Sequence, residues 1–108
     1  MKLPSKIQFA DDKVKKAFID LKSTDKGLHD HLCKAFKDIE ENAFCGIQIP
    51  KRLIPKEYIR RYKIKNLWKY NLAEAWRVFY SIEANEITVI SIVVEWLDHK
   101  KYERKFKY

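Results

Sequence analysis

Two runs decide the predicted fold: Arg60-Arg61-Tyr62-Lys63-Ile64-Lys65-Asn66 and Trp76-Arg77-Val78-Phe79-Tyr80-Ser81-Ile82. If a run is extended, successive side chains alternate between the two faces of a sheet. In the first run this alternation puts Arg61, Lys63 and Lys65 on one face and apolar side chains on the other. The first run is therefore predicted to be a strand with a cationic face.

The second run carries a single charge among apolar and aromatic residues. Its alternation places Trp76, Val78 and Tyr80 on one face, and Arg77 with Phe79 on the other. Cations that crowd together raise the cost of each other's charge, so solvent or an anionic partner must compensate them. A polyphosphate is one such partner, and a solvated strand face is the alternative.

Composition predicts one folded domain over residues 1–108. The chain is 46% hydrophobic with two glycines, which is typical of a globular domain that needs no disulfide or metal for its core. No apolar run reaches the roughly 20 residues of a membrane span. The start, Met1-Lys2-Leu3-Pro4, lacks the apolar segment of a signal peptide. We expect a cytoplasmic protein.

The cysteines and histidines do not predict a metal site. Cys33 and Cys45 are separated by 11 residues and have no Cys-His set beside them, so reduced thiols are expected. His29 and His31 stand two apart on a predicted helix and point to different faces. The sequence therefore implies no metal and no cofactor.

The positive charge of the chain is concentrated in its second half. Residues 1–50 hold nine Lys and Arg against eight Asp and Glu, whereas residues 51–108 hold fourteen against seven, so +7 of the net +8 lies after residue 50. Such asymmetry indicates nucleic acid or an acidic protein as a partner.

The remaining pattern predicts an α+β fold. We expect an N-terminal strand, then a helical hairpin whose helices begin at Asp11 or Asp12 and at Ser23, Thr24 or Asp25. A stiff loop with two prolines and the basic strand come next, and a connection at 67–75 leads to the second run. The chain then forms an apolar strand at 87–95 and a basic, aromatic tail at 100–108. The hairpin is predicted to pack on one side of a three- to four-stranded antiparallel sheet.

In order and spacing, these features resemble the RelE/ParE superfamily of toxins from toxin-antitoxin pairs. The residues that carry the likeness are Tyr62-Lys63-Ile64-Lys65, then Trp76-Arg77-Val78-Phe79-Tyr80, then a hydrophobic strand and Tyr102. The likeness covers nearly the whole chain and is closest to the RelE branch. It implies a metal-independent endoribonuclease that cleaves mRNA in the ribosomal A site, inhibits translation and is neutralised by a cognate antitoxin.

The resemblance implies that four residues act on the scissile phosphate of the RNA: Lys63, Lys65, Arg77 and Tyr102. Attack by the neighbouring 2′-hydroxyl needs a base, positive charge for the transition state and a proton donor for the leaving 5′-oxygen. Either lysine is expected to share the base and electrostatic roles, while Arg77 binds phosphate oxygens as a fork and Tyr102 stacks on a nucleotide. The site requires Lys65 and Arg77 to face the same side of the molecule.

The chain departs from the family after the last strand, where RelE-like toxins usually carry another arginine. The stretch here reads Glu95-Trp96-Leu97-Asp98-His99. Histidine is the residue type suited to proton transfer near neutral pH, so His99, or Arg104 from the tail, is expected to replace the arginine, and a surface role for His99 is the alternative. Further cations are expected to bind the RNA backbone: Arg60, Arg61, Lys100, Lys101, Arg104 and Lys105.

Two other functions fit the same sequence. The ParE branch has the same fold and is thought to poison DNA gyrase without cleaving RNA, and the missing arginine favours such a non-nuclease. A basic α+β domain that binds RNA without cutting it would also explain the charge and the aromatic residues.

Overall fold

The computed structural model describes residues 2–106 of the chain. Within them the strands form one sheet in the order β1-β5-β4-β3-β2. The strands are β1 (Lys6–Phe9), β2 (Ile47–Gln48), β3 (Trp68–Asn71), β4 (Arg77–Ala84) and β5 (Val89–Leu97). The helices are α1 (Asp12–Thr24), α2 (Lys26–Glu41), α3 (Lys56–Tyr62) and α4 (His99–Phe106). Short 3-10 turns lie at Ala43–Cys45, Lys51–Leu53 and Ala73–Ala75.

The predicted α+β class is confirmed, but two details of the sheet were wrong. The sheet has five strands within the described residues, because β2 and β3 form in stretches that were expected to be a loop and a connection. It is also mixed, since β1 pairs with β5 in parallel. The other strand pairs are antiparallel.

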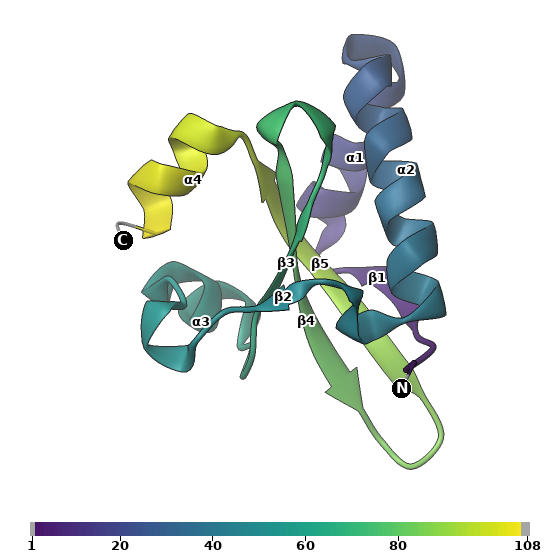
Figure 1. The fold of residues 1–108 in the computed structure, drawn as a ribbon, viewed down its shortest axis with the longest axis vertical. Helices are drawn as coiled ribbons and strands as arrows, with labels where there is room; N and C mark the ends of the chain where they lie inside the picture. Colours follow the sequence, from purple (N-terminus) through teal and green to yellow (C-terminus); the bar gives the residue numbers. More distant parts are fainter. Residues whose placement is uncertain (1, 107–108) are drawn as a thin grey trace.

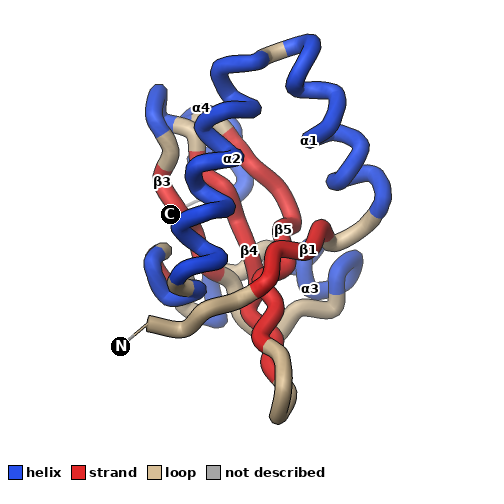
Figure 2. Tube along the Cα trace, turned by 90° about the vertical axis from the view of Figure 1, so that its right-hand side faces the viewer, coloured by secondary structure: helices blue, strands red, loops and turns tan. Residues whose placement is uncertain are grey.

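Helices cover both faces of the sheet, whereas a helix layer on one side was expected. Figures 1 and 2 show α1 and α2 side by side on one face, and Figure 1 shows α3 and α4 on the other. Each layer has its own core. Val78 and Tyr80 pack with the α1–α2 hairpin, while Phe79 packs with α3 and α4. The alternation predicted for β4 is therefore confirmed, and it directs Arg77 to the α4 side together with Phe79.

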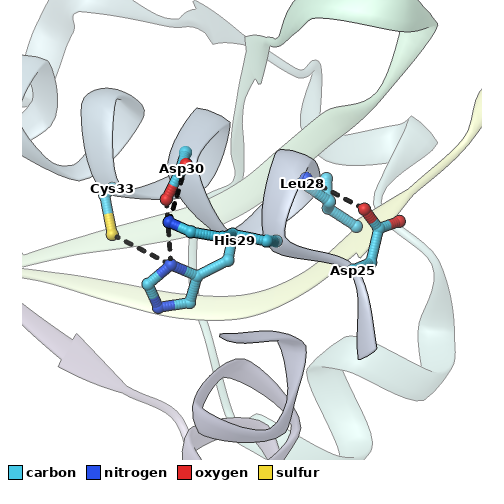
Figure 3. Close-up of polar contacts among 6 residues, drawn as sticks. Asp25, Leu28, His29, Asp30 and Cys33 are labelled. Carbon is cyan, nitrogen blue, oxygen red and sulfur yellow. Dashed lines mark hydrogen bonds and ion pairs between the residues drawn. The ribbon is translucent and has the colours of Figure 1, made fainter. Parts of the chain in front are cut away.

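The hairpin begins as its sequence predicts, with aspartate caps. Asp11 accepts a hydrogen bond from the backbone N–H of Val14 at 2.9 Å. Asp25 accepts one from Leu28 at 3.2 Å at the start of α2, as Figure 3 shows. Each cap satisfies one of the N–H groups that a helix leaves unpaired at its first turn. None of the helices within residues 2–106 is both long and apolar enough to traverse a bilayer.

The strand predicted over residues 60–66 is wrong, because α3 continues to Tyr62. Lys63 then ends the helix in the left-handed conformation (φ 55°, ψ 36°), and its N–H donates to Ile59 O at 2.9 Å. Tyr58 and Tyr62 stand four residues apart and so share one face of the helix, and the ring of Tyr58 is fully buried against the sheet. Burial of this aromatic face favours the helix over the alternating pattern.

The predicted basic tail contains a helix that the sequence analysis did not assign, since His99 to Phe106 form α4. Tyr102 and Phe106 are four residues apart, and both rings are buried against Phe79, at centre-to-centre distances of 5.9 and 4.9 Å. Lys100, Lys101, Glu103 and Arg104 are exposed, whereas Lys105 is partly buried. Residues 107 and 108, the end of the predicted tail, lie outside the described residues.

A β-bulge in β5 changes where its side chains point. Phe79 pairs with Glu95 and Tyr80 pairs with Val93, so Val94 is an extra residue in β5. Val94 is buried in the α3–α4 core, and the next side chain, Glu95, accepts a hydrogen bond from the Tyr58 hydroxyl on the same side. The bulge thus brings a carboxylate to the α3–α4 layer, as bulges commonly redirect a side chain.

Gly46, which precedes β2, should not tolerate a methyl group. A Cβ there would lie 2.6 Å from the Lys69 carbonyl oxygen and 2.6 Å from the Tyr80 hydroxyl, which accepts the Gly46 N–H. Gly46→Ala should lower the free energy of unfolding by about 1–3 kcal/mol in urea melts, since the backbone oxygen cannot move away cheaply. Gly27→Ala is the matched control. Its Cβ meets only Asp25 Oδ1 at 3.7 Å, so it should raise stability by about 0.5 kcal/mol.

Candidate functional site

Two cations converge on Tyr102. Lys69 Nζ donates a hydrogen bond to the Tyr102 hydroxyl at 3.0 Å and lies 4.9 Å from the centre of its ring. The Arg77 guanidinium carbon lies 4.4 Å from the same ring centre. Lys69 and Arg77 are half-buried, and Tyr102 is 5% exposed. The three residues form a compact cationic and aromatic site, which we call the Tyr102 site.

Sheet pairing and the packing of α4 create this convergence. Lys69 in β3 pairs with Phe79 in β4, and Arg77 at the start of β4 pairs with Leu97 at the end of β5. The Tyr102 ring stacks on Phe79 at an interplanar angle of 16°. Three segments that are distant in sequence therefore meet on the α4 side of the sheet.

The Arg77 side chain is oriented by the turn before it. Its Nη1 donates to Ala75 O at 3.0 Å, while Nε is buried and finds no hydrogen-bond acceptor within residues 2–106. A buried unsatisfied donor is rare in folded proteins, and it commonly marks a functional position. Attraction to the Tyr102 ring partly compensates the charge of Arg77.

The turn that orients Arg77 is strained. Glu74 has φ 60° and ψ 32°, and Ala75 has φ 63°, so two consecutive residues with side chains occupy the left-handed region. Such a conformation costs on the order of 1 kcal/mol or more for each residue that is not glycine. This strain lies directly beside the candidate site.

Lys63 and Lys65 do not join the Tyr102 site. Lys63 is exposed at the end of α3, and Lys65 is exposed beside Asn66. The Asn66 side-chain amide donates to Ile82 O and accepts from the Ile82 N–H, both at 2.8 Å. Ile82 is five residues along β4 from Arg77, or about 16 Å at the rise of a strand. The predicted grouping of Lys63 and Lys65 with Arg77 is therefore wrong, because the segment that carries them is not a strand beside β4.

Lys69 is the residue that sequence reasoning missed. The stretch Trp68-Lys69-Tyr70 alternates aromatic and cationic side chains, which is itself a strand signal. The sequence analysis predicts a connection over residues 67–75, so Lys69 is absent from its candidate residues. With β3 in its observed place, Lys69 takes the position beside Arg77 that Lys63 and Lys65 were expected to hold.

His99 stands at the first position of α4, two residues after Leu97. Its Nε2 lies 2.7 Å from Glu103 Oε1, and its side chain is about half exposed. Tyr102 follows one helical turn later on the same helix. The structure thus places His99 on the element that carries Tyr102, bound to a carboxylate through one ring nitrogen.

The other cations expected to bind RNA are spread over α3 and α4. Arg60 and Lys100 are exposed, while Arg61 forms an ion pair with Asp11 at 3.4 Å. Lys101 and Arg104 line a groove of about 940 Å³ between the two helices. We call this the α3–α4 groove; residues 52–57 form one side, Glu95 and Leu97 the floor, and Lys101 and residues 104–106 the other side.

Lys105 differs from these cations because two carboxylates neutralise it. Its Nζ lies 3.0 Å from Glu95 Oε2 and also pairs with Glu57. Burial lowers the pKa of Lys105, but hydrogen bonds and charges from Glu57 and Glu95 outweigh it, so its pKa is raised. Burial and the bond to Glu95 likewise raise the pKa of the Tyr58 hydroxyl. Lys105 therefore ties α4 to α3 and β5.

A second polar cluster lies on α2 and is shown in Figure 3. His29 Nδ1 is 3.7 Å from Cys33 Sγ and 3.4 Å from Asp30 Oδ1. The His29 ring stacks on Phe18 with ring centres 4.7 Å apart, so it packs α2 against α1. Within residues 2–106, no group of three His, Cys, Asp or Glu side chains is placed to hold a metal ion. The cluster serves the packing of the hairpin.

Comparison with known proteins adds no assignment: no protein-family model, curated protein or solved structure matches this chain.

Replacing Ala75 by glycine should relieve the strain in the turn beside Arg77. Ala75→Gly is expected to raise the free energy of unfolding by about 0.5–1 kcal/mol, because glycine adopts φ 63° without a steric penalty. Ala73→Gly, in the same turn but without a positive φ, should lower it by about 0.4–1 kcal/mol. Urea denaturation of both variants measures the difference, and equal effects would contradict the strain.

Proposed function

We propose that this protein is a RelE-like toxin, a metal-independent and ribosome-dependent endoribonuclease that cleaves mRNA in the A site. The observation that carries the proposal is the convergence of Lys69 and Arg77 on Tyr102. Two neighbouring cations suit the non-bridging oxygens of one phosphodiester, and the buried Tyr102 ring holds both cations in place rather than stacking on a base, as the sequence had predicted. The net charge of +8 favours a polyanionic substrate.

The chemistry that we propose is attack by the 2′-oxygen on the adjacent phosphorus. The O2′–P bond forms while the 2′-hydroxyl proton passes to solvent water, the P–O5′ bond breaks with protonation of the leaving oxygen, and the products are a 2′,3′-cyclic phosphate and a 5′-hydroxyl. Lys69 and Arg77 stabilise the negative charge that builds on the non-bridging oxygens, in a setting that is half removed from water. Tyr102, which is buried on Phe79, positions Lys69 through its hydroxyl and Arg77 through its ring.

We assign the proton of the leaving 5′-oxygen to His99. Its Nε2 is bonded to Glu103, which fixes the ring and leaves Nδ1 for the substrate. Arg104, the other candidate for this role, lines the α3–α4 groove instead. His99 would thus act from the same helix as Tyr102.

The proposal includes a cognate antitoxin and a cytoplasmic setting, where the ribosome is found. Both follow from the resemblance. An acidic segment that folds onto the basic surface would neutralise the toxin by charge and by covering the site.

A second candidate function is RNA binding without cleavage. The stretch Glu95-Trp96-Leu97-Asp98-His99 contains no arginine, and this observation favours a relative that has lost the reaction. A ParE-like gyrase poison, which would act on DNA gyrase and not on RNA, is the other non-nuclease alternative. Ribosome-bound mRNA cleavage and gyrase-dependent DNA breakage, measured side by side, distinguish these outcomes.

Variants of the Tyr102 site and of the exposed lysines after α3 test the assignment. Lys69→Ala and Arg77→Ala should each slow mRNA cleavage on programmed ribosomes by about 10²–10³-fold, because each removes a charge from the transition state. Lys63→Ala and Lys65→Ala are matched controls with the same charge change, and they should stay within about threefold of the parent rate. Primer extension measures cleavage, and circular dichroism checks the fold of each variant.

Two results would contradict the assignment of the site. Full activity of Arg77→Ala would show that the Tyr102 site is not catalytic. Loss of activity only in Lys65→Ala would support the site predicted from the alternating pattern. A parent protein that binds ribosomes but leaves mRNA intact would favour the non-cleaving candidate.

His99→Ala should slow the same cleavage by about 10²-fold, which is the usual contribution of a positioned general acid. A substrate with a 5′-thio leaving group needs no proton, so it should be cleaved by the variant and the parent at similar rates. If His99→Ala is also about 10²-fold slower than the parent on the thio substrate, His99 does not donate the proton.

A further inference from the structure

We propose that the α3–α4 groove binds the single-stranded RNA that continues from the cleaved linkage, which makes it an extension of the Tyr102 site. This inference rests on the proposed function for the identity of the polymer. The inference that the groove binds a ligand is argued from the residues that line it, from its charge and from its position beside Tyr102.

The charge of the groove is positive and largely uncompensated. Its lining holds five cationic side chains and two carboxylates, a net charge of +3. Both carboxylates, Glu57 and Glu95, are bound to Lys105 deep in the groove. The four other cations are exposed, and none forms an ion pair within residues 2–106: Arg52, Lys56, Lys101 and Arg104.

These four cations stand on opposite sides of an apolar floor. Arg52 and Lys56 come from the turn at Lys51–Leu53 and the start of α3, while Lys101 and Arg104 come from α4. Between them lies an apolar surface that includes Ile54 and Leu97. Cationic walls with an apolar floor match the phosphates and the base faces of a single strand. A polyglutamate segment would use the walls but offers no apolar face to the floor.

The groove adjoins the Tyr102 site through α4. Phe106 lines the groove, and its ring lies 4.9 Å from the ring of Tyr102. Leu97 lines the groove as well and pairs with Arg77 across the sheet. The two places therefore lie on either side of α4, and a strand whose phosphate lies at Lys69 and Arg77 reaches the groove by passing over the exposed face of this helix. The site would cleave, and the groove would hold the neighbouring nucleotides.

The test uses fluorescence anisotropy with a labelled 2′-O-methyl RNA nonamer, which cannot be cleaved because it lacks the 2′-hydroxyl. Arg52→Gln/Lys56→Gln removes one wall of the groove. We expect about tenfold weaker binding, and a slope of log K against log salt that is smaller by about 1.4, at about 0.7 for each lost phosphate contact. A 2′-O-methyl trimer is too short to reach from the Tyr102 site into the groove. It should occupy the Tyr102 site alone and bind the variant and the parent equally.

Lys15→Gln/Lys37→Gln is the matched control, since it removes two exposed lysines from the α1–α2 layer. It should leave the salt slope unchanged. If both double variants lose the same affinity, the effect is one of net charge and the groove inference is overturned. If a polyglutamate peptide binds as tightly as the nonamer and is weakened equally in the groove variant, the groove is a site for acidic segments, and the RNA assignment is overturned.

The result also separates the groove from the proposed function. A protein that cleaves ribosomal mRNA but binds the nonamer equally with and without Arg52 and Lys56 overturns the groove alone. A protein that never cleaves but loses nonamer binding in the groove variant supports the groove and contradicts the nuclease.

Discussion

Phe79 is the residue on which the functional half of this protein is assembled. Its side chain is fully buried, and its ring packs against Tyr58 from α3 and against Tyr102 and Phe106 from α4. Burial of each such aromatic ring contributes about 1.5–3 kcal/mol. An eight-residue helix is not stable by itself in water, so α4 depends on this aromatic contact for its existence.

The same contact sets the position of the charges. Because Tyr102 is held on Phe79, it offers a ring and a hydroxyl to the Lys69 amine and a ring face to Arg77. On the far side of α4, Lys105 is fixed by Glu57 and Glu95, which prevents two carboxylates from standing uncompensated in a basic groove. Aromatic packing and ion pairing therefore leave Lys105 neutralised, while the exposed cations of the groove have no acidic partner among the described residues.

The arrangement has a cost that is local to the site. The turn before β4 holds two residues with side chains in the left-handed conformation, and Arg77 keeps a buried N–H without an acceptor within the described part of the chain. Natural proteins tolerate such features mainly where binding or chemistry requires them. Both features lie beside Lys69 and Tyr102, at the site on which the proposed function rests.

Local pattern determined the α+β class, the aspartate-capped hairpin and the two-residue alternation that directs Arg77 and Phe79 to one face. These features depend on side chains close in sequence, so periodicity and capping chemistry suffice to predict them. Tertiary structure decided that residues 56–62 are helical, that Lys69 and not Lys63 or Lys65 joins Arg77, and that the basic tail is a helix. Tyr58 and Tyr102 are buried only because Phe79 lies opposite them, and no local pattern records a contact between segments so far apart in the chain.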